Sequence, residues 1–190
     1  MSEEVALRAK QRCGAEVFVG DILDAPFPPE FFDAITCIHV LEHVYKPKEV
    51  MARIANWLRP GGVFYLMIPN IDSAAFRFFK SYWYALELPR HLFHFSPKTL
   101  NDAAGGAGLK ALLIRTKREI FFEQSVQYLL DDAARAIGIR RLPMATAPTP
   151  GIPFRIVRKA FRIAMLPLID RLIGLGGDKE LTEAVFQKQP

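Results

Sequence analysis

The sequence predicts an α/β fold, and one stretch of the chain carries most of that prediction. Residues 32–40 form a nearly unbroken apolar run rich in Ile, Val, Thr and Phe, which is typical of a strand buried on both faces. A helix is expected after Pro47, because apolar residues then recur at helical spacing and proline suits a first turn. Residues 60–62, Pro-Gly-Gly, are expected to stop this helix, and residues 63–68 to form a second apolar strand. This order predicts a right-handed parallel βαβ unit.

The length and composition predict one folded domain in a reducing compartment. The 190 residues are 51% hydrophobic and include 15 Phe, which is enough for a sizeable core. A formal net charge of +5 is modest, so no nucleic-acid partner is expected. Cys13 and Cys37 are expected to be free thiols. The first residues are partly acidic and lack the apolar run of a signal peptide, so we expect a cytoplasmic protein.

The segment before the βαβ unit offers a first candidate ligand residue. A short helix is expected from Ser2 to about Cys13, with acidic residues in its first turn. Residues 16–20 are expected to form a short strand that ends at Asp21. Ligands of open α/β sheets bind beyond the carboxyl ends of the strands, so Asp21 is well placed to meet one. The alternative is that Asp21 only caps a turn.

Three polar residues follow the strand expected over residues 32–40. Their spacing, His39-x-x-Glu42-His43, is also that of inverted zinc peptidases. That chemistry needs both histidines on one face of a helix, whereas His39 ends a strand here, so the peptidase interpretation is disfavoured. His43 is a candidate general base, because imidazole titrates near neutral pH. The alternative is a structural hydrogen bond between Glu42 and His43.

A series of spaced motifs follows the chain: Asp33 at a strand start, Glu42 and His43 after that strand, residues 58–62 at the turn, and Pro69 and Asn70 at the end of the next strand. This series resembles the class I S-adenosylmethionine-dependent methyltransferases. The branch is the one similar to ubiquinone-biosynthesis O-methyltransferases and envelope-sugar methyltransferases, and the resemblance covers residues 2–118 and the last strand. It implies a Rossmann-like sheet and S-adenosylmethionine as the cofactor.

The resemblance also assigns roles to the residues near the strand ends. It implies that Asp21 and the apolar Ile22 recognise the adenine, and it places His39 and Val40 at the cofactor. In the related O-methyltransferases a Glu often stands at the position of His39, and the resulting cluster can hold a divalent metal. With two imidazoles and one carboxylate here, His39, Glu42 and His43 would favour a softer metal or none. We therefore expect no metal, with these three residues as the alternative site.

An aromatic-rich excursion over residues 71–96 is expected to lie above the carboxyl edge of the sheet, where it would cover a substrate pocket as a lid. The resembled branch has a matching Leu-Pro-Arg-His run, here residues 88–91. Arg90 is a candidate partner for a carboxylate or phosphate of the acceptor. His91 is a candidate acid–base residue, with packing as the alternative, whereas His94 is expected to pack. Arg90 and His91 join Glu42 and His43 as the expected catalytic residues.

The second half of the chain is expected to interrupt and then close the sheet. Ser96 should cap a helix, residues 109–117 should form a strand, and residues 181–186 the last, antiparallel strand. The expected division is a core over residues 1–118, a helical insertion over residues 119–178 and a closing strand over residues 179–190.

The insertion itself is expected to contain two helices. The first covers residues 124–139, and a Pro-rich linker over residues 142–153 separates it from the second, residues 154–175. The second helix is basic and amphipathic, which suggests a contact with an anionic membrane surface and a peripheral place at the inner membrane. The alternative is a helix packed on the sheet with solvated arginines.

The main departure of this sequence from the family's pattern concerns the glycine-rich cofactor loop, which follows the first strand in the family. A carboxylate ends the family's second strand, and this sequence starts after both. We therefore expect an N-terminally truncated, partial Rossmann-like methyltransferase sheet that lacks the first two strands. The expected function is O-methyl transfer to a small or lipid-linked acceptor, impaired by loss of the loop. The alternative is a non-catalytic, methyltransferase-like binding or scaffold protein that associates with a partner or a membrane surface.

Overall fold

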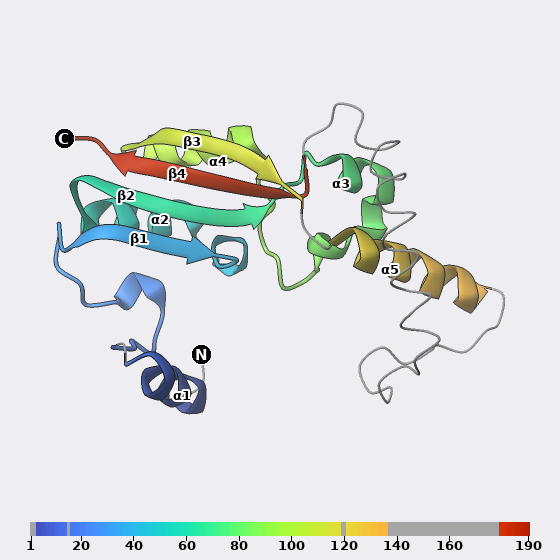
Figure 1. Ribbon diagram of the computed structural model, residues 1–190, viewed down its shortest axis with the longest axis horizontal. Coiled ribbons are helices and arrows are strands. Elements are labelled where there is room, and N and C mark those ends of the chain that lie inside the picture. Colours follow the sequence, from blue (N-terminus) through green and yellow to red (C-terminus); the bar gives the residue numbers. More distant parts are fainter. Residues whose placement is uncertain (1–2, 15, 119–120, 137–178) are drawn as a thin grey trace.

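The computed structural model describes residues 3–14, 16–118, 121–136 and 179–190 (Figure 1). The Pro-rich linker and the basic helix expected over residues 154–175 lie outside these residues, so the membrane contact and the domain division remain predictions. The helices are α1 (Glu3–Cys13), α2 (Pro47–Trp57), α3 (Ala74–Phe79), α4 (Pro97–Gly106) and α5 (Phe121–Ala136), and the strands are β1 (Phe32–Ile38), β2 (Leu58–Pro69), β3 (Leu109–Lys117) and β4 (Leu181–Lys188).

The four strands form one mixed sheet in the order β1-β2-β4-β3. Strands β1 and β2 are parallel and are joined through α2, which confirms the predicted βαβ unit. Strand β4, from the far end of the sequence, is antiparallel to both β2 and β3 and lies between them (Figure 1). The sheet is therefore a partial Rossmann-like sheet with an antiparallel closing strand, as the sequence predicts.

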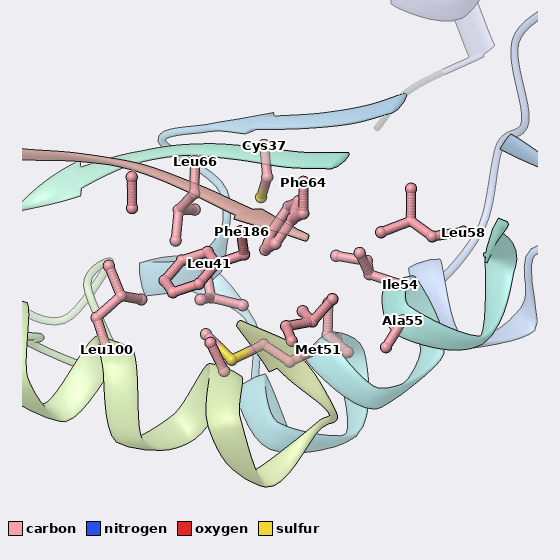
Figure 2. Packing of buried hydrophobic residues seen from close by; sticks show 14 of the residues in the cluster. Cys37, Leu41, Met51, Ile54, Ala55, Leu58, Phe64, Leu66, Leu100 and Phe186 are labelled. Atoms are coloured by element: carbon pink, nitrogen blue, oxygen red, sulfur yellow. The ribbon is translucent and has the colours of Figure 1, made fainter. Parts of the chain in front are cut away.

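One face of the sheet is covered by α2 and α4, and the main core lies between these helices and the strands (Figure 1). Met51 and Ile54 of α2 and Leu100 of α4 point toward Phe64 and Phe186 of the sheet (Figure 2). All five side chains are buried. This packing agrees with the helical spacing of apolar residues after Pro47.

The opposite face of the sheet is open. The prediction that residues 32–40 are buried on both faces is therefore wrong. Within β1, Cys37 points into the core, whereas Ala34, Thr36 and Ile38 are exposed. Strand β1 is an edge strand, and no helix covers this second face among the described residues. An apolar run indicates burial on both faces only when both faces have a covering layer.

Two local predictions also differ from the structure. Residues 16–20 form no strand, since a strand needs a neighbour and no described strand pairs with this segment. Helix α2 ends at Trp57, before the Pro-Gly-Gly sequence, and β2 starts at once with Leu58 opposite Phe32. The residues of the expected turn therefore lie inside the strand, at an irregularity of the β1–β2 register, where Gly61 takes φ 77°.

A charged network crosses the uncovered face of the sheet. Glu183 of β4 is buried and accepts hydrogen bonds from the Tyr65 hydroxyl at 2.7 Å, from Lys117 Nζ at 2.6 Å and from Arg115 Nε. The two cations and the hydroxyl stabilise the charged carboxylate, and Arg115 has the largest effect. Together they lower the pKa of Glu183 to about 2.

Candidate functional site

The chain turns sharply where β1 ends, and this turn presents the predicted polar residues. His39 takes a left-handed φ of 51°, and its backbone N–H donates to the Met67 carbonyl oxygen of β2 at 3.0 Å. A short 3-10 turn, η2 (Leu41–His43), follows and contains Glu42 and His43. The end of β1 thus places these side chains at the carboxyl edge of the parallel strand pair, where ligands of such sheets bind.

The lid segment, residues 71–96, has a small core of its own. It contains α3 and the 3-10 turns η3 (Lys80–Tyr82) and η4 (Tyr84–Leu86), which enclose the buried side chains of Phe79 and Trp83. Helix α5 packs against it, and Ser125 Oγ accepts the Tyr84 N–H at 2.8 Å. The lid segment is therefore a structured layer beside the sheet (Figure 1).

Backbone hydrogen bonds fasten the end of the lid segment to the turn after β1. The N–H groups of Leu92 and Phe93 donate to the Glu42 carbonyl oxygen at 2.8 and 3.2 Å. His43 Nδ1 donates in turn to the Arg90 carbonyl oxygen at 3.0 Å. These bonds bring the Leu-Pro-Arg-His run against the polar residues of η2.

A cluster of three side chains results, and we call Glu42, His43 and His91 the rim cluster. One ligand-type atom of each residue lies within 4.8 Å of those of the other two. The rings of His43 and His91 meet edge to face with centroids 4.6 Å apart. Glu42 is only 1% exposed, and its Oε2 atom has no hydrogen-bond partner among the described residues.

The surroundings of the rim cluster fix the chemistry of both imidazoles. His91 Nδ1 donates to the Ala85 carbonyl oxygen at 2.7 Å, as His43 Nδ1 does to Arg90. A carbonyl oxygen can only accept, so each Nδ1 carries a proton. His43 Nε2 is then the ring nitrogen that can accept a proton, whereas His91 Nε2 lies 3.2 Å from Glu87 Oε2 and is placed to donate to that carboxylate. The cluster therefore offers one imidazole nitrogen beside a buried carboxylate.

The other predicted residues take different places. His39 Nδ1 lies 3.2 Å from Glu42 Oε1. His39 is not part of the close group of three, whereas the alternative metal set named from the sequence included it. The Arg90 guanidinium is exposed and pairs with Glu87 at 2.5 Å. His94 is half-buried, and its Nε2 donates to the Leu86 carbonyl oxygen at 3.1 Å, which agrees with a packing role.

Sequence reasoning missed Glu87. Its Oε2 atom lies 3.2 Å from His91 Nε2, so the lid segment adds a second carboxylate beside the rim cluster. An acidic residue three and four positions before two candidate site residues was the only available signal.

The residues expected at the adenine lie in the turn before β1. Asp21 is exposed, and its Oδ1 atom accepts the Leu23 N–H at 2.9 Å, which caps the turn η1 (Ile22–Asp24). Ile22 packs on the edge of the main core. The capping role left open by the sequence is thus present. Val40 is 39% exposed and stands just before η2, next to the rim cluster in the chain.

Comparisons with known proteins agree with this fold. The profile of a family described as "Methyltransferase domain" matches residues 4–114, more than half of the chain. A SAM-dependent methyltransferase of Thermotoga maritima superposes on 99% of this chain and 70% of its own with a TM-score of 0.60, at 16% identity. A SAM-dependent methyltransferase of Archaeoglobus fulgidus gives a TM-score of 0.57 over 98% and 73% of the two chains, at 14% identity.

Curated relatives match over shorter segments. A ubiquinone biosynthesis O-methyltransferase of Dechloromonas aromatica is 36% identical over 76 residues, which are 40% of this chain and 30% of the relative. The protein of the same name from Xanthomonas campestris is 44% identical over 48 residues, 25% of this chain and 20% of the relative. The matched segments thus span less than a third of these relatives.

Among the described residues, no helix is long and apolar enough to cross a membrane. The family profile covers the βαβ unit, η2, the lid segment and most of β3, and the solved structures share the sheet that carries them. On these grounds the chain belongs to the methyltransferase-domain family.

Proposed function

We propose that this chain serves S-adenosylmethionine-dependent transfer of a methyl group to a hydroxyl oxygen of a small or lipid-linked acceptor. Family membership supports methyl transfer, and the names of the curated relatives support oxygen as the acceptor atom. The observation that carries the proposal is the rim cluster, where His43 keeps an Nε2 lone pair beside a buried carboxylate.

The reaction places few chemical demands on the protein. The cofactor supplies an electrophilic methyl group on a sulfonium. The acceptor oxygen forms the new C–O bond in line as the C–S bond breaks, and the hydroxyl proton must leave. Positioning contributes most of the rate, and a base contributes about 10²- to 10⁴-fold. His43 Nε2 takes this proton, while the Arg90 carbonyl oxygen holds the ring in place.

The apolar surface next to the rim cluster in the chain supports an acceptor with an apolar part. Val40 and Leu92 are each 39% exposed, and Leu88 is 67% exposed. They flank Glu42, His43 and His91 along the turn after β1 and along the lid segment. Exposed apolar side chains grouped around a few convergent polar atoms are typical of small-molecule sites.

Adenine recognition by Asp21 and Ile22 is part of the proposal. The Asp21 cap uses Oδ1, so Oδ2 stays open to an exocyclic amine. Calorimetry with S-adenosylhomocysteine tests this, since Asp21→Ala should weaken binding whereas Asp24→Ala, in the same turn, should not. Equal binding by both variants would contradict the assignment.

The catalytic proposal is tested by methyl transfer to a catechol that bears an alkyl chain, followed through release of S-adenosylhomocysteine. We expect His43→Ala to lower the rate about 10²- to 10⁴-fold and to leave cofactor binding unchanged. His94→Ala is the matched control, because this histidine also bonds a carbonyl oxygen but lies outside the rim cluster. An unchanged rate in His43→Ala would contradict the role of His43. No transfer by the folded wild-type chain would favour the binding or scaffold alternative.

A further inference from the structure

We propose that strand β1 pairs along its outer edge with β1 of a second copy of this chain, antiparallel and across a two-fold axis. The pairing surface consists of residues 34–38, and we call it the β1 edge. The inference goes beyond the proposed function, and its test does not depend on methyl transfer.

The first argument is that the β1 edge presents backbone groups without a described partner. Among the described strands β1 pairs only with β2, and the two are parallel (Figure 1). Along such a strand the backbone groups of successive residues point alternately toward the neighbour and away from it. His39 donates to Met67 of β2, so the N–H and C=O groups of Ala34, Thr36 and Ile38 point outward. No described residue bonds these groups, and all three residues are exposed.

The second argument is the difference between the two edge strands of the sheet. Strand β3, at the other edge, has an irregular register with β4 and carries three cationic residues, Lys110, Arg115 and Lys117. Cationic side chains and bulges prevent edge strands from pairing with other chains. Residues 34–38 contain no charged residue, proline or glycine, and their register with β2 is regular. The β1 edge is therefore open to pairing, whereas the β3 edge is protected from it.

The third argument is that the β1 edge is complementary to itself. An antiparallel arrangement with Thr36 on the two-fold axis places Ala34 of each copy opposite Ile38 of the other. These residues all direct backbone groups outward, so each opposed pair exchanges two hydrogen bonds. A small side chain then faces a large one, and threonine faces threonine, both of which are favourable cross-strand arrangements.

The two ends of β1 are also complementary in charge and in apolar surface. Near the amino end, Phe31 is exposed, and the Asp33 side chain is 81% exposed although it pairs with Arg59. Beyond the carboxyl end lie the half-buried His39 and the exposed Val40. An antiparallel pair brings the amino end of one strand to the carboxyl end of the other. It therefore places a carboxylate near an imidazole and a Phe near a Val at both ends.

This arrangement closes at two copies and reaches the candidate site. A two-fold interface uses the same surface of both copies, and the protected β3 edge does not extend the sheet further. The amino end of the second β1 then lies beside His39 and Val40, which adjoin the rim cluster in the chain. Each copy thus contributes Phe31 and Asp33 to the border of the other copy's site.

Sedimentation velocity of the 190-residue chain over a range of concentrations tests the association. We expect a monomer–dimer equilibrium without larger species. Thr36→Pro removes one outward N–H, a change that an edge strand tolerates, and should weaken dimer formation about tenfold. Thr36→Lys places like charges opposite each other on the axis and is the second variant, should circular dichroism show that Thr36→Pro does not fold. The control Leu112→Lys, at a position 54% exposed on β3, should leave the association unchanged.

Disulfide cross-linking in a Cys13→Ser background tests the register. Cα atoms of a hydrogen-bonded antiparallel pair lie about 5.5 Å apart, which suits a disulfide. Mild oxidation of Thr36→Cys should therefore give a covalent dimer, while the native Cys37 is buried. A mixture of Ala34→Cys and Ile38→Cys chains should cross-link better than either variant alone. Leu112→Cys, equally accessible to the oxidant, is the control and should remain a monomer.

Hydrogen exchange distinguishes a second copy from any other cover of the β1 edge. The amides of Thr36 and Ile38 should gain protection as the concentration rises through the range of dimer formation. Protection of these amides in the monomer would mean that another part of this chain covers the edge, and would overturn the inference. It is also overturned if the chain stays monomeric, if both Thr36 variants still form the dimer, or if Leu112→Cys cross-links as well as Thr36→Cys.

Discussion

The imidazole rings of His43 and His91 stand edge to face with centroids 4.6 Å apart, although one residue follows β1 and the other belongs to the lid segment. This contact joins the two parts of the chain from which the candidate site is built. The backbone bonds from Leu92 and Phe93 to the Glu42 carbonyl oxygen run beside it. The position of the lid segment and the geometry of the rim cluster are therefore coupled.

Replacement of His91 by Ala should loosen the end of the lid segment. The ring contact with His43 and the bond to the Ala85 carbonyl oxygen are both lost, so the amides of Leu92 and Phe93 open more often. We expect faster hydrogen exchange at these two amides and an unchanged rate in β2. Leu88→Ala is the control, because its side chain is 67% exposed. Equal protection in both variants would show that the backbone bonds alone hold the lid segment.

The network around Glu183 should make stability depend on pH in the acid range. The folded-state pKa of about 2 lies below the ordinary value of 4.5, so the network stabilises the fold fully above pH 4.5. This contribution is lost as the pH falls from 4.5 toward 2. Glu183→Gln should therefore lower Tm at neutral pH, and the difference from wild type should shrink on acidification.

Thermal unfolding followed by circular dichroism over this pH range measures the effect. Glu49→Gln is the matched control, since Glu49 is exposed and forms an exposed ion pair with Lys46 at 3.2 Å. Exposed pairs of this kind contribute about 0–1 kcal/mol. A difference between Glu183→Gln and wild type that stays constant on acidification would contradict the role of the carboxylate charge.

Two glycines should respond to alanine in opposite ways. A Cβ atom on Gly62 would lie 2.9 Å from the Arg59 carbonyl oxygen and 3.1 Å from that of Asp33, so Gly62→Ala forces the backbone to shift. We expect a loss of about 1–3 kcal/mol in the free energy of unfolding. Gly105, within α4, has open space around the same position, and Gly105→Ala should stabilise by about 0.4–1 kcal/mol. Urea denaturation of both variants measures whether each substitution raises or lowers the free energy of unfolding.

The cap of α4 offers a fourth prediction. Ser96 Oγ accepts the Thr99 N–H at 3.1 Å, and Thr99 Oγ1 accepts the Ser96 N–H at 2.9 Å, which is a reciprocal capping box. Ser96→Ala should reduce the free energy of unfolding by about 1 kcal/mol. Lys98→Ala, an exposed residue of the same turn, should change it by less than about 0.5 kcal/mol. Equal effects in urea denaturation would show that the cap bonds contribute little.

The elements whose ends are set by local sequence signals were predicted correctly. Pro47 and Ser96 mark the starts of α2 and α4, and the apolar spacing after Pro47 identifies the buried face of α2. The errors concern pairing between distant segments. Residues 16–20 have the composition of a strand but no neighbour, and the apolar run of β1 has a cover on only one face. Neither fact can be deduced from a single segment.

The candidate site divides in the same way. Their place after the first apolar strand and the family resemblance singled out His39, Glu42 and His43, and the Leu-Pro-Arg-His run of the resembled branch singled out His91. That His91 lies next to η2, and that His39 Nδ1 faces Glu42 Oε1, depends on the tertiary fold and could not be predicted from the motifs. Glu87 escaped notice because an acid in an irregular segment is usually a solvated side chain.

The burial of Cys37 gives the protein a built-in reporter of its own opening. Burial, the main cause, raises the pKa of this thiol to about 11, so the reactive thiolate is scarce at neutral pH and the sulfur is shielded from solvent. An alkylating reagent will label Cys37 only when β1 separates from the helices beneath it. In a Cys13→Ser background, the labelling rate then measures how often β1 opens. Any ligand that stabilises the end of β1 will lower this labelling rate.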